Sequence, residues 1–317
     1  MASPAAFFDW SSERGALRTS IAVTLCVAAI GIVFGLLSGS FSIMFDGFYS
    51  LVDASMSALA LTVVNLIAFT ATSEPHSARL RERFNMGFWH LEPIVLGLNG
   101  VLLIGVAFYA LINAISSLLE GGRDLEFGYA ILYGVVTVIA CFGAAWIEAR
   151  ANRKIRSDFI RLDVRSWIMS GSITAALLVA FCVGYAVQGT RWEWISPYID
   201  PAVLALVCVI IIPMPISTVR QALSDILLMT PPDLKLHVDA VAKAFVAKHN
   251  FQSYRVYAAK VGRAKQIELY FIVPPDSPAR TIGEWDALRD EVGEAIGGES
   301  SDRWLTVVFT GDREWAE

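Results

Sequence analysis

Six long runs of apolar residues occupy the first two thirds of the chain. They cover residues 16–37, 41–70, 91–119, 127–149, 163–187 and 198–219. A helix needs about 20 predominantly apolar residues to cross a bilayer, so each run is long enough to span a membrane. The second and fifth runs are less uniformly apolar than the others because they contain aspartates. The pattern therefore predicts an all-α bundle of six transmembrane helices.

The periodicity changes after Thr230-Pro231-Pro232. Residues 233–249 have apolar positions at helical spacing, and two alternating runs, SYRVYAAKV and KQIELYFIV, then flank Gly262-Arg263 in the manner of a β-hairpin. A second helical stretch at 282–297 and a strand at 304–310 follow. This order of helix, strand, strand, helix and strand predicts a small open sheet with helices on one face. We therefore divide the chain into an N-terminal segment (1–15), a transmembrane domain (16–221), a linker (222–232) and a soluble α+β domain (233–317).

Composition agrees with a membrane protein and argues against several other classes. The chain is 55% hydrophobic and only 17% charged, whereas soluble domains carry about 25% charged residues. A net charge of −5 without a clustered basic surface argues against a nucleic-acid partner. The sequence has no nucleophile elbow, phosphate-binding glycine loop or zinc-protease motif, so we expect no enzymatic activity.

Basic residues are distributed unequally between the two ends of the predicted helices. One side carries those near the N-terminus and in the loops after the second and fourth runs: Arg14, Arg18, Arg79, Arg81, Arg83, Arg150, Arg153, Lys154, Arg156 and Arg161. The other side offers only Arg123 and Arg191. By the positive-inside rule, both termini face the cytoplasm. We expect the protein to lie in the plasma (inner) membrane.

The last apolar run contains two prolines, Pro213 and Pro215. Proline has no backbone N–H, and its ring clashes with the preceding turn of a helix. We therefore expect this run to kink or to lose its regular hydrogen bonding near these residues, either as a moving part or as a bent helix packed against its neighbours.

Two stripes of oxygen-bearing side chains interrupt the second and fifth runs. Each follows i, i+3, i+7 spacing, which places its three members on one side of a helix. The stripes are Asp46, Tyr49 and Asp53 in the second run and Asp163, Ser166 and Ser170 in the fifth. Carboxylates are costly in a membrane span and are by default candidates for a functional site. The alternative is that these groups cap or bridge helices near the interface, since serine often bonds to its own helix backbone.

The chemistry of such a site suggests cation exchange. Burial favours the protonated form of a carboxylic acid, and a bound divalent cation reverses that preference and releases protons. A site with both properties, opened alternately to the two sides of a membrane, would exchange a cation for protons.

The sequence resembles the cation diffusion facilitator (cation efflux) family over nearly its whole length. The matching pieces are GLLSGSFSIMFDGFYSLVD, FNMGFWHLEP, SDFIRLDV, YIDP and the alternating C-terminal region, in that order. The resemblance implies a six-helix transporter that forms a homodimer, exports a divalent metal cation in exchange for protons and ends in a cytoplasmic ferredoxin-like domain.

This chain departs from the family pattern at the transport site. The family usually has His or Asp and Asp, four residues apart, on the second span and a similar pair on the fifth. The first pair maps onto Tyr49 and Asp53, and the second onto Ser166 and Ser170. Asp46 and Asp163 correspond to aspartates that many members also carry, and they could form a shifted site with Asp53. All these ligands are oxygens, which suit Mg²⁺ or Mn²⁺ better than Zn²⁺, although Fe²⁺ and Zn²⁺ remain open and no permanently bound cofactor is expected.

Two further questions stay open at this stage. Glu92 and His90 lie at the start of the third run, where a structural tie to a basic loop is the expected role and metal ligation the alternative. Asn99, Glu148 and Asp200 could also line the cavity. The lost ligands equally suit a transport-inactive regulatory or heterodimer subunit, or a transporter of a different solute such as a monovalent cation.

Overall fold

The computed structural model describes residues 13–71, 82, 84, 87–155, 158–300 and 302–317. Several basic positions used for the orientation, namely Arg79, Arg81, Arg83 and Arg156, lie outside the described residues, as does most of segment 1–15. The chain divides into two compact units. The first unit combines Met1–Leu59 with Leu98–Ser217, and the second combines Ala60–Gly97 with Thr218–Glu317.

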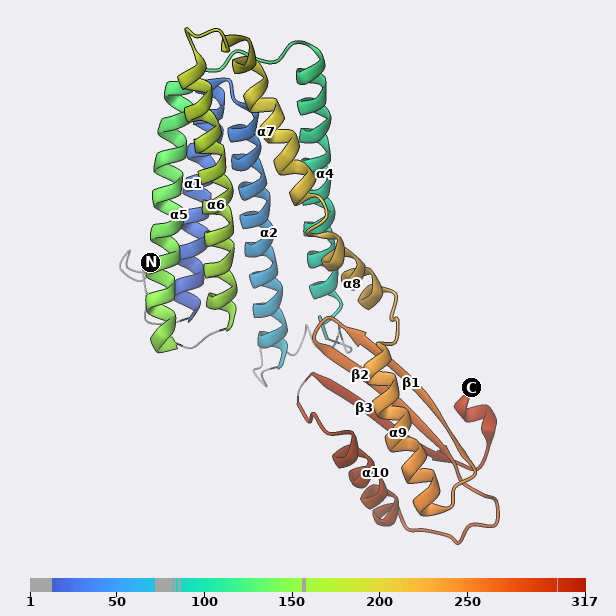
Figure 1. Ribbon diagram of the computed structural model, residues 1–317. Coiled ribbons are helices and arrows are strands. Elements are labelled where there is room, and N and C mark those ends of the chain that lie inside the picture. The colour runs from blue at the N-terminus through green and yellow to red at the C-terminus, as the bar shows by residue number, and fades with distance from the viewer. Residues whose placement is uncertain (1–12, 72–81, 83, 85–86, 156–157, 301) are drawn as a thin grey trace. The chain divides into compact units, whose positions relative to one another are not determined.

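Long helices account for the apolar part of the chain (Figure 1). They are α1 (Glu13–Ser38), α2 (Phe41–Ala71), α4 (Leu91–Leu119), α5 (Phe127–Ile155), α6 (Asp158–Val187), α7 (Ser196–Ile211) and α8 (Ile216–Ile226), with a short 3-10 helix, η3 (Glu193–Ile195), before α7. Over the described residues, six helical segments are long and apolar enough to cross a membrane, the last being formed by η3, α7 and α8 together. The predicted six-helix membrane bundle is confirmed.

The last apolar run is broken where its prolines lie. Helix α7 ends at Ile211, residues 212–215 form a turn, and α8 begins at Ile216. The break follows from the chemistry of Pro213 and Pro215, which cannot donate the backbone hydrogen bonds that would continue the helix. Helix α8 then continues to Ile226, so residues 222–226 at the start of the expected linker are helical.

Close packing of α1 against α2 fixes the acidic helix within the first unit. A Cβ atom added at Gly47 of α2 would lie 2.7 Å from the backbone nitrogen of Ile32 and 2.9 Å from the carbonyl oxygen of Ala28, both in α1. Only glycine permits this approach of two backbones, a common feature of membrane helix pairs. On the neighbouring side, Ile43 of α2 joins a buried cluster with Tyr133 of α5 and Phe181 of α6.

A buried carboxylate from α7 caps the start of α2. Asp200 is 2% exposed. Its Oδ1 accepts a hydrogen bond from the Ser40 hydroxyl (2.5 Å) and its Oδ2 one from the Phe41 amide (3.0 Å). The Ser42 amide approaches Oδ1 at 3.4 Å, and the Ser42 hydroxyl donates to the Asp200 carbonyl oxygen (2.9 Å). Since the first amides of a helix have no partner within it, Asp200 has a structural role and ties α7 to α2.

The soluble part of the second unit is a three-stranded sheet with two long helices (Figure 1). Its elements are α9 (Pro232–His249), β1 (Ser253–Val261), β2 (Ala264–Ile272), α10 (Ile282–Ile296), β3 (Arg303–Thr310) and the 3-10 helix η4 (Arg313–Ala316). Strands β1 and β2 are antiparallel, with Val261 opposite Ala264 across the hairpin. Strand β3 runs parallel to β2 after the α10 crossover. The predicted element order and hairpin are confirmed.

One apolar face of this sheet forms the core of the soluble part. Ile267, Leu269 and Phe271 alternate along β2 and are almost fully buried. They pack in one cluster with Val238 of α9 and Val292 of α10. Because alternate residues of a strand point to the same face, both helices cover the same side of the sheet, as the sequence pattern predicts.

Candidate cation site

The three residues of the α2 stripe have different neighbours within the first unit. Asp46 accepts a hydrogen bond from the Tyr133 hydroxyl of α5 at 2.6 Å. Tyr49 is half-buried, and its ring packs against that of Phe45, with 5.6 Å between the ring centres. Asp53 is exposed, and its Oδ1 lies 3.5 Å from Nδ2 of Asn99 on α4. The stripe thus changes from a tightly bonded carboxylate at Asp46 to an accessible one at Asp53.

Asp163 is the acidic residue that α6 brings toward Asp53. It is half-buried, and its carboxylate interacts electrostatically with that of Asp53. Its other polar neighbours are Ser20 of α1 and Glu148 of α5. The two sequence-predicted aspartates from the second and fifth spans therefore lie near each other, although 110 residues separate them in the chain.

The two serines of the α6 stripe have other surroundings. Ser166 is exposed. Ser170 is half-buried, and its Oγ lies 3.9 Å from the Sγ atom of Cys141 on α5. Its backbone carbonyl also accepts a hydrogen bond from the Thr174 hydroxyl (3.0 Å). Of the three residues in the α6 stripe, Asp163 is therefore the one that interacts with Asp53.

Glu148 is a further acidic group beside Asp163. Its side chain is 1% exposed, and neither carboxylate oxygen has a hydrogen-bond partner among the described residues. Ser20 and Trp167 lie beside it, but the Trp167 indole donates its hydrogen bond to the Ser20 hydroxyl (2.9 Å). The sequence named Glu148 only as one of three possible lining residues, with Asn99 and Asp200, and gave no way to rank them.

Asn99 contributes a neutral oxygen near Asp53. Its side-chain oxygen Oδ1 is buried and has no partner within the described part of the chain. Asn99, Asp53, Asp163 and Glu148 thus follow one another as neighbours and come from four different helices, α4, α2, α6 and α5. We refer to these four residues as the oxygen cluster.

The oxygen cluster offers only oxygen atoms as possible ligands. Across the described ranges, no three His, Cys, Asp or Glu side chains form a group that could hold a metal ion. The amide oxygen of Asn99 or the hydroxyl of Ser20 would therefore have to supplement the carboxylates. Such an all-oxygen donor set suits Mg²⁺ or Mn²⁺ and lacks the nitrogen and sulfur ligands typical of zinc sites.

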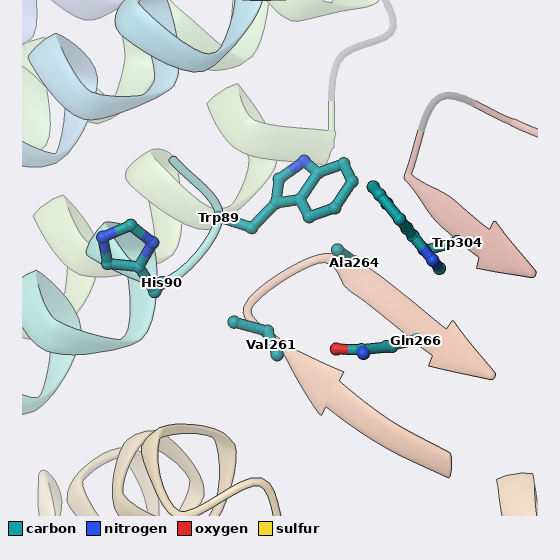
Figure 2. Close-up of a pocket in the computed structure, with 6 residues that line it drawn as sticks. All are labelled: Trp89, His90, Val261, Ala264, Gln266 and Trp304. Carbon is teal, nitrogen blue, oxygen red and sulfur yellow. The ribbon is translucent and has the colours of Figure 1, made fainter. Parts of the chain in front are cut away.

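A pocket in the second unit involves the other residues considered from the sequence. It is lined by Trp89, His90, Val261, Ala264, Gln266 and Trp304 (Figure 2). Beside it, Nε of Arg263 in the hairpin turn donates to Oε2 of Glu92 at 3.0 Å, and this bond raises the pKa of the Arg263 guanidinium. Gly262 occupies the left-handed region (φ +61°), and a Cβ there would lie 3.0 Å from the Trp89 carbonyl oxygen. Glu92 therefore has a basic partner, but this partner is Arg263 of the β1–β2 turn, whereas the loop before Glu92 with Arg79, Arg81 and Arg83 lies outside the described residues.

Comparison with known proteins assigns the family. The model of the cation efflux transmembrane domain matches residues 17–227, which include the whole oxygen cluster. Two proteins are each 21% identical to this chain over 256 residues, covering 80% of this chain and 74% of the relative: the metal cation efflux system protein CzcD of Cupriavidus metallidurans and the cation efflux system protein CzcD of an Alcaligenes species. With its six apolar helices and C-terminal sheet domain, the chain belongs to the cation diffusion facilitator, or cation efflux, family of integral membrane transporters.

Proposed function

We propose that this protein exports a divalent metal cation from the cytoplasm in exchange for protons, through a site between α2 and α6 centred on Asp53 and Asp163. The observation that carries the proposal is the Asn99 side chain beside Asp53: its Nδ2 lies 3.5 Å from Asp53 Oδ1, and its buried Oδ1 has no partner among the described residues. Neighbouring carboxylates repel each other unless a proton or a cation compensates their charge. Competition between protons and a divalent cation for the same oxygens couples the two fluxes.

The nature of the ligands favours a hard cation. Asp53, Asp163 and the Asn99 amide offer only oxygen atoms, so we propose Mn²⁺ or Mg²⁺ before Zn²⁺. Asp46 is bonded to Tyr133, and we assign it a supporting role beside Tyr49. Ser170 and Ser166 would at most supply outer oxygens. We further propose cytoplasmic termini, the plasma (inner) membrane as location, and a homodimer in which the soluble domain (233–317) contributes to association.

Transport by purified protein in vesicles tests this function. Wild-type protein should move Mn²⁺ or Mg²⁺ across the vesicle membrane faster when a proton gradient is imposed. Asp53→Asn, which keeps the side chain's shape but removes its charge, should reduce that flux to the level of protein-free vesicles. Ser55→Ala is a matched control on the same helix, because the Ser55 hydroxyl donates to the Leu51 carbonyl oxygen at 2.7 Å in its own helix. Normal flux in Asp53→Asn would refute the proposed site.

A second candidate function is a transport-inactive subunit that regulates or pairs with an active relative. It is favoured by the lack of three His, Cys, Asp or Glu ligands at one point in the described structure and by Tyr49, Ser166 and Ser170 at positions where the family has ligands. Purified protein that binds no divalent cation in a titration across Mg²⁺, Mn²⁺, Fe²⁺, Co²⁺ and Zn²⁺ would support this function. Measurable binding would exclude it in favour of transport.

A further inference from the structure

We infer that Glu148 of α5 is a direct ligand of the transported cation, which extends the donor set to a helix that carries neither of the predicted stripes. The inference rests on the proposed function, since it names an additional ligand of the same site. The class of cation is a hard, oxygen-preferring divalent ion such as Mn²⁺ or Mg²⁺.

The first argument is that neither oxygen of this carboxyl group makes a well-formed hydrogen bond within the described residues, while Ser20, Trp167 and Asp163 lie beside it. Glu148 is 1% exposed, and both of its oxygens are without a hydrogen-bond partner in the described ranges. No ion pair of Glu148 with a described Lys, Arg or His is found either. The nearby indole donor of Trp167 is already used by Ser20. Burial favours the protonated form of such a carboxyl group, and a bound divalent cation would replace that proton at the same oxygens.

The second argument is the direction in which Glu148 faces. Its neighbours are the carboxylate of Asp163 and the hydroxyl of Ser20, and Asp163 in turn interacts with Asp53. The carboxyl groups of Glu148 and Asp163 beside the Ser20 hydroxyl thus bring several oxygen donors together. A divalent cation would compensate both carboxylates at once, which a second hydrogen bond from the protein would not do.

Asp200 shows that burial alone does not identify a ligand. It is as deeply buried as Glu148, at 2% exposure. Its oxygens are occupied by the Ser40 hydroxyl and the backbone amide of Phe41. Asp200 therefore has a sufficient structural explanation, and it is the matched control for Glu148.

Metal-dependent thermal stability of the purified full chain tests the inference. We expect Mn²⁺ to raise the melting temperature of the wild-type protein. Glu148→Gln should melt at the same or a higher temperature than wild type without metal, lose most of the Mn²⁺-induced rise, and bind Mn²⁺ about 10-fold or more weakly in a calorimetric titration. Asp200→Asn should melt at a lower temperature than wild type without metal and keep the full Mn²⁺-induced rise.

Each other outcome contradicts the inference in a different way. If Glu148→Gln binds Mn²⁺ like wild type while Asp53→Asn binds it weakly, Glu148 is no ligand and the proposed function stands. If Glu148→Gln fails to fold or melts early without metal, Glu148 has a structural role, since an unpartnered carboxylate should contribute nothing to the metal-free fold. If the wild-type protein binds neither Mn²⁺ nor Mg²⁺, the proposed function fails together with the inference.

Discussion

Asp200, which caps the start of α2, and Glu148 of the oxygen cluster are equally buried carboxylates with opposite surroundings. At the start of α2, Asp200 accepts hydrogen bonds from the Ser40 hydroxyl and the Phe41 amide. In the oxygen cluster, both oxygens of Glu148 lack a partner within the described residues, as does the side-chain oxygen of Asn99. The protein satisfies the acid at the start of α2 with its own hydrogen bonds, whereas these oxygens of the cluster have no partner in the described ranges.

This difference separates structural acids from candidate ligands in a membrane protein. Burying a polar group without a hydrogen bond is unfavourable, whereas burying a hydrogen-bonded polar group costs little free energy. An acid that is satisfied by the protein needs no further explanation. An acid that is left unsatisfied lowers the stability of the empty protein and is expected where binding restores that loss.

The largest effect should come from Asp163 in the oxygen cluster. Asp163→Asn removes the charge that faces Asp53 and Glu148, so we expect Mn²⁺ flux in vesicles to fall to background. Without metal, its melting temperature should remain at or above that of wild type, because a repulsion between carboxylates is relieved. Ser172→Ala on the same helix is the control and should transport normally, because the Ser172 hydroxyl donates to the Ile168 carbonyl oxygen at 2.7 Å. If Asp163→Asn fails to fold, Asp163 has a structural role like that of Asp200, and the proposed site is wrong at this residue.

A smaller effect, on stability, is expected at the start of α2. Asp200→Ala leaves the Ser40 hydroxyl and the Phe41 amide without their acceptor, and we expect a loss of about 3 kcal/mol in the free energy of unfolding. Unfolding in detergent measures the loss, and flux should be normalised to the amount of folded protein. Unchanged stability together with abolished flux per folded molecule would mean that Asp200 is a functional acid and that the comparison between the two regions is wrong.

The smallest effect should come from an acid that is partnered but exposed. In the soluble part, Glu291 accepts hydrogen bonds from Lys248 Nζ (2.9 Å) and from His249 Nε2 (3.2 Å), and these contacts lower its pKa. Its side chain is 36% exposed, so solvent screening limits the contribution to less than about 1 kcal/mol.

The pH dependence of Glu291 has a definite sign. Because the folded pKa is lowered, the stabilisation is present above the ordinary carboxyl pKa and disappears as the pH falls through the lowered value. We therefore expect Glu291→Gln to be slightly less stable than wild type at neutral pH and equal to it in acid. Thermal unfolding of the full chain over a pH series checks this, and a difference that grows in acid would contradict the assigned sign.

The fold could be predicted from the sequence to a large extent because its main signals are local. The length of the apolar runs predicted the six membrane helices, and Pro213 and Pro215 predicted the break between α7 and α8. The alternation around Gly262 predicted the β1–β2 hairpin. Each of these features depends on residues that are close in sequence.

The candidate site could be predicted only in part, since it depends on which helices lie side by side. Asp53 and Asp163 were identified from the spacing along their own helices, and their proximity is consistent with that hypothesis. The surroundings of Glu148 and Asp200 were not predictable, because both are single acids near the end of an apolar run. The arrangement of the helices decides the difference. The Asp200 carboxylate accepts hydrogen bonds at the start of α2, and the Glu148 oxygens have no partner among the described residues.

The most direct test of the central claim is to locate the cation itself. Anomalous scattering from a crystal of the full chain grown with Mn²⁺ would show where the ion binds. We predict a single strong peak within bonding distance of Glu148 and of at least one of the two aspartates, Asp53 and Asp163. We predict no peak at Asp200. A peak at Asp200, or a fully loaded protein with no Mn²⁺ near the oxygen cluster, would contradict the account.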